Sequence, residues 1–171
     1  MKLELRIDSP DDGEPQSPVP IAGWSAFEPV LSEELLDVFP NIAGYEAVEF
    51  SVSLLSPDEM RSVNREHRGC DEATDVLSFP LWEEEGRFAP DPMMAGSLLP
   101  LGDVLICLEE TRRLHPNLAE DQSLCLMLAH SFLHLLGWDH DTDERRQTMW
   151  DRQDALSARL LTALEAAGGR G

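Results

Sequence analysis

The chain has 171 residues, of which 42% are hydrophobic and 27% are charged, as is usual for a globular domain. Its formal net charge of −20 argues against a general nucleic-acid-binding protein, because contacts to phosphates require Lys and Arg. The three cysteines are widely spaced and form no C-x-x-C pair, which argues against a disulfide framework and against a cysteine-type zinc site.

The length predicts a single domain over residues 1–171. No stretch is long and apolar enough to predict a transmembrane span. The first ten residues alternate polar and apolar side chains and contain no hydrophobic core of a secretory signal. A cytoplasmic location is therefore the expectation.

Patterns of apolar residues define the elements of the first half of the chain: a strand over 2–7, a Pro-rich surface loop over 9–20, a helix over 27–39 and a strand over 47–54. The sequence Ser56-Pro57-Asp58-Glu59 is a capping box, with Pro at the first helical position. It predicts a helix that runs to about His67.

The second half continues with a strand over 74–80, a surface loop over 81–100, a strand over 103–108, a short helix over 109–114 and helices over 118–136 and 141–164. Together these elements predict an α+β fold in which a four-stranded mixed sheet is flanked by helices. The second half of the helix over 118–136 reads LCLMLAHSFLHLL and is apolar nearly all round, so we expect it to be buried centrally.

This central helix carries the strongest chemical signal of the chain. His130 and His134 are spaced i, i+4, which places both imidazoles on one face of the helix. Gly137 follows and allows the chain to leave the helix in a left-handed conformation, so that His140 can return to the same point. Three imidazoles with an open fourth position are the ligands of a catalytic zinc site, although nickel and copper also bind such ligands.

The spacing of these histidines is that of the metzincin proteases, which makes the predicted fold zincin-like. In the metzincins a Glu follows the first histidine and acts as general base, whereas this chain has Ser131 there. A serine hydroxyl does not accept a proton at neutral pH. A metallopeptidase therefore stays an alternative that lacks its usual base.

Residues 130–140, reading HSFLHLLGWDH, resemble the H-G-x-L-H-L-x-G-[YW]-D-H signature of the YbeY family of bacterial rRNA maturation factors, described as metal-dependent endoribonucleases. The chain departs from it at Ser131, where the family usually has Gly. Residues 64–68 with 74–80 resemble the family's N-x-x-[YH]-R…TDVLSFP, and residues 102–106 resemble its GDI-type strand. The resemblance does not rest on the Pro-rich segment or on residues 82–99.

The resemblance implies one zinc ion bound by His130, His134 and His140, and an active-site role for Arg68. It also implies a single-strand-specific endoribonuclease in late 16S rRNA 3′-end maturation and ribosome quality control, with rRNA and the small ribosomal subunit as partners. Independently, the arginine fork suits a phosphate oxygen. The alternative for Arg68 is an interaction with the helix dipole.

A further alternative is a non-catalytic ribosome-assembly factor with a structural metal, since the acidic composition suits a basic ribosomal protein as partner. Neither a membrane nor a dinucleotide is an expected partner. We expect a set of arginines to cluster around the metal cleft; scattered arginines and carboxylates lining the cleft would count against direct RNA binding. The arginines of this set are Arg61, Arg65, Arg68, Arg112 and Arg113.

Several other residues near the motif carry expectations of their own. Asp75 and Asp103 could accept hydrogen bonds from the metal-binding imidazoles, or could form ordinary hydrogen bonds at strand ends. Asp139 is expected to fix the turn before His140 by bonding backbone amides, and Trp138 to pack over the site. His67 and His115 are expected to be ordinary surface or helix-end residues.

Overall fold

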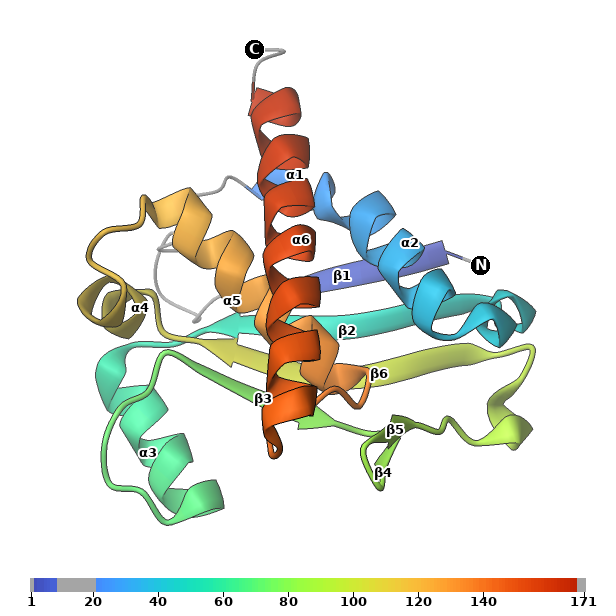
Figure 1. The fold of residues 1–171 in the computed structure, drawn as a ribbon, viewed down its shortest axis with the longest axis horizontal. Helices are drawn as coiled ribbons and strands as arrows, with labels where there is room; N and C mark the ends of the chain where they lie inside the picture. The colour runs from blue at the N-terminus through green and yellow to red at the C-terminus, as the bar shows by residue number, and fades with distance from the viewer. Residues whose placement is uncertain (1, 9–20, 169–171) are drawn as a thin grey trace.

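A computed structural model describes residues 2–8 and 21–168 of the protein. Its main sheet has the strand order β1-β2-β6-β3 (Figure 1). Three of its strands, β1 (Lys2–Asp8), β2 (Ala47–Leu54) and β6 (Leu98–Ile106), are parallel, and β3 (Val76–Pro80) pairs antiparallel with β6. The predicted α+β fold with a four-stranded mixed sheet is confirmed. The predicted loop over 9–20 lies outside the described residues.

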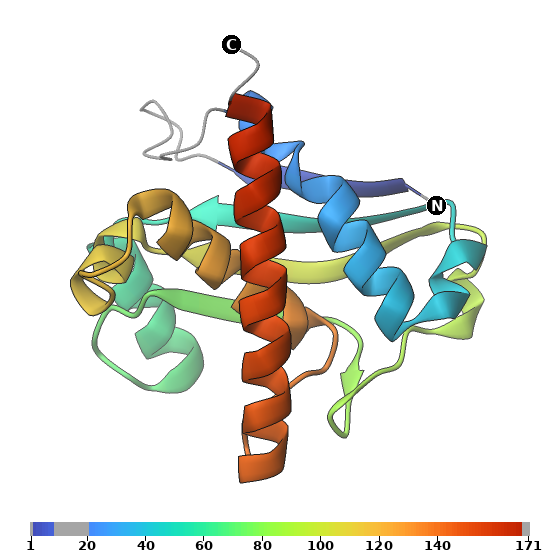
Figure 2. The same cartoon turned by 45° about the horizontal axis from the view of Figure 1, so that its top comes forward.

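The helices are α1 (Ile21–Trp24), α2 (Phe27–Val38), α3 (Pro57–Arg68), α4 (Leu108–Leu114), α5 (Glu120–Leu135) and α6 (Asp143–Gly168). Short 3₁₀ turns cover Pro40–Gly44 and Pro92–Met94. The long helix α6 crosses over α2 and α5 on one side of the sheet (Figure 2). Among the residues that the structure describes, no helix is long and apolar enough to cross a membrane.

The core lies between the sheet and α5. Val48, Phe50, Val52 and Leu54 alternate along β2 and are buried, as the sequence pattern predicts. The ring of Phe132 on α5 lies 5.3 Å from the ring of Phe50, and both side chains are withdrawn from solvent. Burying one such phenyl group stabilises the fold by roughly 1.5–3 kcal/mol. The predicted central, buried helix is confirmed, and its place against the sheet fixes the histidines that it carries.

Local contacts define both ends of helix α3, which begins at Pro57 and ends at Arg68. The Ser56 hydroxyl accepts from the Glu59 amide at 3.3 Å, and the Glu59 carboxylate accepts from the Ser56 amide at 2.8 Å. Gly69 follows the helix with φ of 71°, a left-handed conformation that favours glycine. The predicted capping box is confirmed, and Arg68 occupies the last helical position.

The prediction of a surface loop over 81–100 is wrong in part. A small hairpin forms from β4 (Glu83–Glu84) and β5 (Arg87–Phe88), and β6 already begins at Leu98, with Leu99 fully buried. Pro100 is compatible with the strand because β3 pairs only with residues 102–106, so β6 has one neighbour at this point and a bulge opposite Glu49–Ser51. Each hairpin strand has two residues, which are too few for an alternation of polar and apolar side chains to reveal a strand in the sequence.

Candidate metal centre

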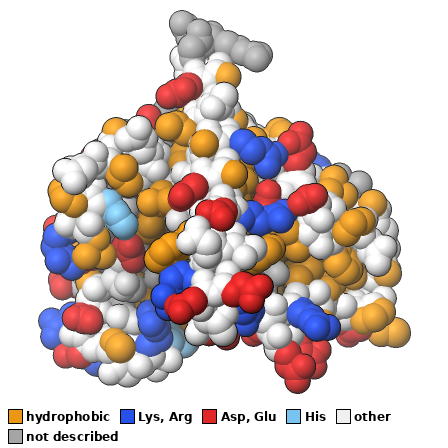
Figure 3. All heavy atoms as spheres, viewed as in Figure 1, with side chains coloured by type: hydrophobic (Ala, Val, Ile, Leu, Met, Phe, Trp, Pro, Cys, Tyr) orange, Lys and Arg blue, Asp and Glu red, His pale blue; other side chains and the backbone are white. Residues whose placement is uncertain are grey.

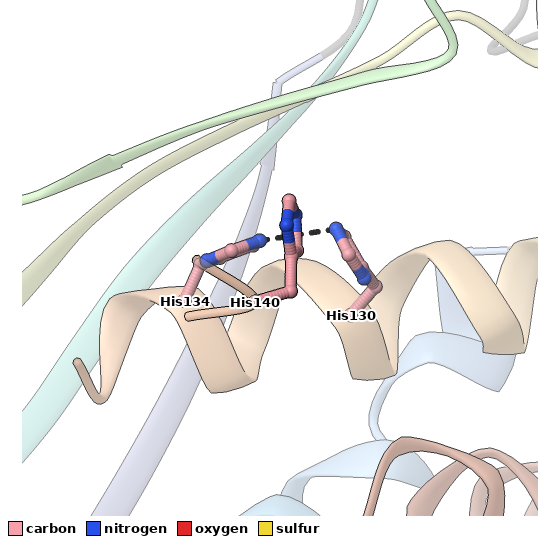
Figure 4. Close-up of side chains that lie close together, drawn as sticks. All are labelled: His130, His134 and His140. Carbon is pink, nitrogen blue, oxygen red and sulfur yellow. Dashed lines mark hydrogen bonds between the residues drawn. The ribbon is translucent and has the colours of Figure 1, made fainter. Parts of the chain in front are cut away.

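His130 and His134 project from one face of α5 toward a cleft beside β3 (Figure 4). The chain leaves α5 through Gly137, whose φ is 83°. A Cβ atom at this position would lie 2.7 Å from the carbonyl carbon of Arg87 and 2.9 Å from the amide nitrogen of Phe88, so the hairpin leaves no room for a side chain. The turn brings His140 back to the other two histidines, as the sequence predicts.

The three imidazoles form one group. The Nε2 atoms of His130 and His134 are 3.1 Å apart, and one potential ligand atom from each of the three residues lies within 4.8 Å of the others. Ligand nitrogens on a tetrahedral zinc ion, with bonds of about 2.0–2.1 Å, are about 3.3 Å apart. The group can therefore hold a metal ion, and the helical pair already has the required separation.

Hydrogen bonds fix which nitrogen faces the shared point. The backbone carbonyl of Trp138 accepts from Nδ1 of His134 at 2.8 Å, and Oε1 of Gln153 on α6 accepts from Nδ1 of His130 at 2.6 Å. In a neutral ring the proton on Nδ1 leaves Nε2 bare. Two lone pairs thus face each other across 3.1 Å, an arrangement that repels unless a cation lies between them, so the donor set fits a metal ion.

Burial keeps both helical histidines neutral. It lowers the pKa of His134 to about 4, with a further contribution from the neighbouring His130. Burial also lowers the pKa of His130, although the hydrogen bond to Gln153 opposes that shift. Neutral imidazole is the form that binds metals, so no proton competes strongly at pH 7.

The histidines line a cleft of about 380 Å³. Arg68 reaches this cleft from the end of α3, and Ser78 and Pro80 border it from the edge strand β3. The guanidinium of Arg68 has no carboxylate within 4.0 Å in the described part of the chain. The structure therefore brings Arg68 and the three predicted ligands to one cavity, with the arginine fork free for an anionic ligand.

The prediction that five arginines surround this cleft is wrong for every one except Arg68. The other four bind carboxylates elsewhere: Arg61 and Arg65 bind Asp71, Arg112 binds Glu120, and Arg113 binds Glu110. Figure 3 shows basic and acidic side chains interspersed on one face of the molecule. Glu83 and Asp139 also line the cleft, so one arginine faces two carboxylates there.

Neither Asp75 nor Asp103 accepts a hydrogen bond from His130, His134 or His140 within the described residues. The strand-end alternative is correct for Asp75, which precedes β3, whereas Asp103 lies inside β6 and bonds across to β2. Asp75 accepts from the amide of Val76 at 2.9 Å and lies 3.3 Å from Nε2 of His115, and Asp103 accepts from the Ser51 hydroxyl at 2.5 Å. His115 is the C-cap residue of α4, a helix-end residue as expected, and it lies half-buried beside the carboxylate of Asp75.

The turn residues behave as predicted. The carboxylate of Asp139 accepts from the backbone amide of His140 at 2.7 Å, which fixes the turn. Trp138 packs beside the site, with the guanidinium of Arg152 5.3 Å from its ring centre. The sequence analysis missed Gln153, which lies thirteen positions after His140 in an ordinary amphipathic helix and carries no local signal.

Fold and site together define a class of protein: an α+β domain whose central helix presents a three-histidine group that can hold a metal ion in an open cleft. Comparison with known proteins narrows this class. Residues 26–161 match the family model described as endoribonuclease YbeY. The chain belongs to the endoribonuclease YbeY family, a family of RNA-cleaving enzymes, and the resemblance seen in the sequence is confirmed.

Several curated relatives carry the name endoribonuclease YbeY. The protein from Caldanaerobacter subterraneus subsp. tengcongensis is 38% identical over 119 residues, which are 67% of this chain and 75% of the relative. The protein from Bacillus subtilis is 36% identical over 138 residues, 74% of this chain and 86% of the relative. The solution structure of TM1509 from Thermotoga maritima covers 95% of this chain and 93% of its own, with a TM-score of 0.53 and 26% identity.

Proposed function

We propose that this protein is a zinc-dependent, single-strand-specific endoribonuclease of the cytoplasm that acts in late 16S rRNA 3′-end maturation and ribosome quality control. The observation that carries the proposal is the position of an unpaired arginine, Arg68, in the cleft of the three histidines. A metal ion and a free guanidinium side by side suit a phosphodiester, which carries negative charge in the ground state and gains more during cleavage.

The residues of the chain divide the work of cleavage. His130, His134 and His140 would hold the ion, and a bound zinc ion polarises a phosphate oxygen and activates a nucleophile. The guanidinium of Arg68 can bind a second phosphate oxygen with two N–H groups and stabilise charge that develops there. With one arginine against two carboxylates in the lining, a divalent cation turns the cleft from net negative to net positive.

The metallopeptidase alternative is weakened by the contacts of Ser131. This residue is fully buried, and its hydroxyl donates to the carbonyl of Met127 at 2.7 Å and to that of Leu128 at 3.1 Å. It neither faces the cleft nor can accept a proton at neutral pH. The position that carries the general base in metzincins therefore supplies none in this chain.

The acidic surface favours a second candidate function, a ribosome-assembly factor whose metal is structural. Four of the five arginines expected to attract RNA are bound to carboxylates, and the net charge is −20. Long-range attraction to RNA is weak in such a chain. In both functions a basic ribosomal protein would bring the chain to the small subunit, and the two differ in whether RNA is cut.

A cleavage assay with matched variants separates these functions. Purified protein is assayed for metal content and then incubated with single-stranded and duplex oligoribonucleotides, with and without a chelator. We expect cleavage of the single strand, loss with chelator and recovery with zinc. Arg68→Gln should lower kcat/KM by about 10²–10³-fold, as removal of one oxyanion-stabilising donor does.

The control is Arg65→Gln, which removes the same charge one turn earlier on α3, where Arg65 binds Asp71 and does not line the cleft. Its activity should equal that of the unmodified protein. If zinc-loaded protein leaves all RNA intact yet binds small-subunit particles, the assembly-factor function is correct. Robust hydrolysis of an unstructured protein substrate would instead support the peptidase.

A further inference from the structure

Arg87 is unusual among the basic side chains of this acidic protein. Of the lysines and arginines within residues 2–8 and 21–168, Arg68 and Arg87 alone have no carboxylate within 4.0 Å. Arg68 lines the metal cleft, and Arg87 lies exposed on the hairpin strand β5. In a chain with 33 acidic residues, these are the two guanidinium groups of the described ranges that remain unpaired and can bind an anion from outside.

Arg87 lines a second pocket of about 400 Å³, which we name the Arg87 pocket. Its lining includes Val38, Arg87, Phe88, Leu136, Gly137 and Trp138. Gly137 and Trp138 also line the metal cleft, so the two cavities share one wall. The backbone of Arg87 lies directly against Gly137, because a Cβ atom there would be 2.7 Å from the Arg87 carbonyl carbon. The two cavities are therefore adjacent, on either side of the contact between the Arg87 backbone and Gly137.

The Arg87 pocket combines an arginine with aromatic rings. Phe88 is half-buried, and its ring is held edge-on by Phe39 at 5.3 Å. Trp138 forms the shared wall, and its ring is fixed by Arg152. Cationic groups that track a backbone, together with rings on which bases stack, are the means by which proteins bind single-stranded nucleic acid.

The remaining charged groups of this pocket limit the number of phosphate groups that it can bind. Arg145 binds Asp141 at 3.0 Å and donates to the carbonyl of Gly86 at 3.4 Å, so its charge is already used. Glu144 is exposed at the same pocket and repels a second phosphate. The pocket thus suits a ligand with a single phosphate at Arg87 and a planar ring beside it. One nucleotide has this composition.

We propose that the Arg87 pocket binds the nucleotide next to the one cleaved at the metal centre. Arg87 binds its phosphate, and Phe88 with Trp138 contacts its base. The inference rests on the proposed function, because it takes single-stranded RNA as the ligand. It assigns the hairpin over 83–88, which shares no motif with the family signature, a part in holding the substrate of this chain.

Arg87→Gln tests the phosphate contact in metal-loaded protein. The probe is a labelled, cleavage-resistant 2′-O-methyl oligonucleotide, titrated by fluorescence anisotropy at several salt concentrations. We expect binding to weaken about tenfold, as for the loss of one charge-assisted hydrogen bond. The slope of log affinity against log salt should fall by about 0.7, the value for one phosphate contact of a single strand.

Kinetics on cleavable RNA give a second reading. Because Arg87 lies outside the cleft of the reacting phosphate, Arg87→Gln should raise KM and leave kcat unchanged, whereas Arg68→Gln lowers kcat. Phe88→Leu keeps an apolar side chain and should weaken oligonucleotide binding about fivefold to tenfold through lost stacking. The control is Arg146→Gln, a partly exposed arginine that binds Asp143 and lines neither cavity.

The outcomes separate this inference from the proposed function. If the protein cleaves RNA and Arg87→Gln behaves like Arg146→Gln in both assays, the Arg87 pocket is overturned and the proposed function stands. If no RNA is cleaved but the oligonucleotide binds and Arg87→Gln weakens it tenfold, the pocket stands and the proposed function fails. If the unmodified protein neither binds nor cleaves, both are overturned.

Discussion

The metal centre has two unlike halves. His130 and His134 stand on a helix in the core, half-buried, with Nδ1 of each ring held by a hydrogen bond and the Nε2 atoms 3.1 Å apart. His140 stands on a loop, is exposed, and within the described residues its ring has no hydrogen-bond partner. Only the backbone amide of His140 is held, by the carboxylate of Asp139.

This difference indicates how the site is organised for use. The helical pair is preorganised, because packing of α5 against the sheet and the two Nδ1 hydrogen bonds fix the rings before any ion arrives. The loop histidine can move toward an ion and away from it at little cost, since no hydrogen bond of its ring must break and its ring contacts within the described residues are with the other two histidines. We infer that affinity for the metal comes mainly from the helical pair, and that His140 completes the site.

The largest effect on metal binding is expected when one ligand is removed from each half in turn. His134→Ala breaks the preformed pair, and we expect the purified variant to retain no metal and to show no cobalt absorption on titration. His140→Ala leaves the pair intact and should bind cobalt(II) weakly but measurably. Metal content by mass spectrometry and the cobalt spectrum together give the ranking. Equal loss in the two variants would show that the halves do not differ in energy.

A smaller effect is expected from Gln153, which holds one ring of the preorganised half. Gln153→Leu removes the acceptor for Nδ1 of His130 and should weaken metal affinity about 10–100-fold, the usual loss for a group that orients a metal ligand. Gln153→Glu keeps an oxygen acceptor and should restore affinity. The measurement is a competition titration with a chromophoric chelator, so it requires no RNA.

Gln147→Leu is the matched control for that comparison. Gln147 lies on the same helix α6, is exposed, and donates to Asp151 at 2.8 Å without touching a histidine. Its variant should bind metal as tightly as the unmodified protein. A similar loss in both variants would attribute the effect to α6 as a whole rather than to the hydrogen bond on His130.

How far the site could be predicted depends on how local its contacts are. His130, His134 and His140 were predictable because an i, i+4 spacing and one left-handed glycine fix their positions over eleven residues. Gln153 was not, because its contact depends on where α6 crosses α5, which no local pattern encodes. The place of Arg68 was expected from the family resemblance rather than from the chain alone.

The misplaced arginines have a different cause. Arg113 binds Glu110 on its own helix, and Arg61 binds Asp71 just beyond the helix that it stands on. With 33 acidic residues against 13 basic ones, most exposed arginines find a nearby carboxylate before a distant cleft. The exceptions, Arg68 and Arg87, could not be recognised from composition, because being unpaired is a property of the folded surface.

The smallest loss of metal affinity is expected in the loop half, from substitution of Asp139. Its carboxylate accepts from the amide of His140 at 2.7 Å, the contact that sets where the loop presents the ring. Asp139→Ala removes this hydrogen bond, which in an exposed turn is worth about 0.5–1.5 kcal/mol, so metal affinity should fall about twofold to tenfold. Asp139→Asn keeps a side-chain oxygen and should lose less. Because His140 is free to adjust, the loss should stay below that of Gln153→Leu in the same chelator competition. A larger loss for Asp139→Ala would mean that the turn, and not the helical pair, is the part of the centre that must be built in advance.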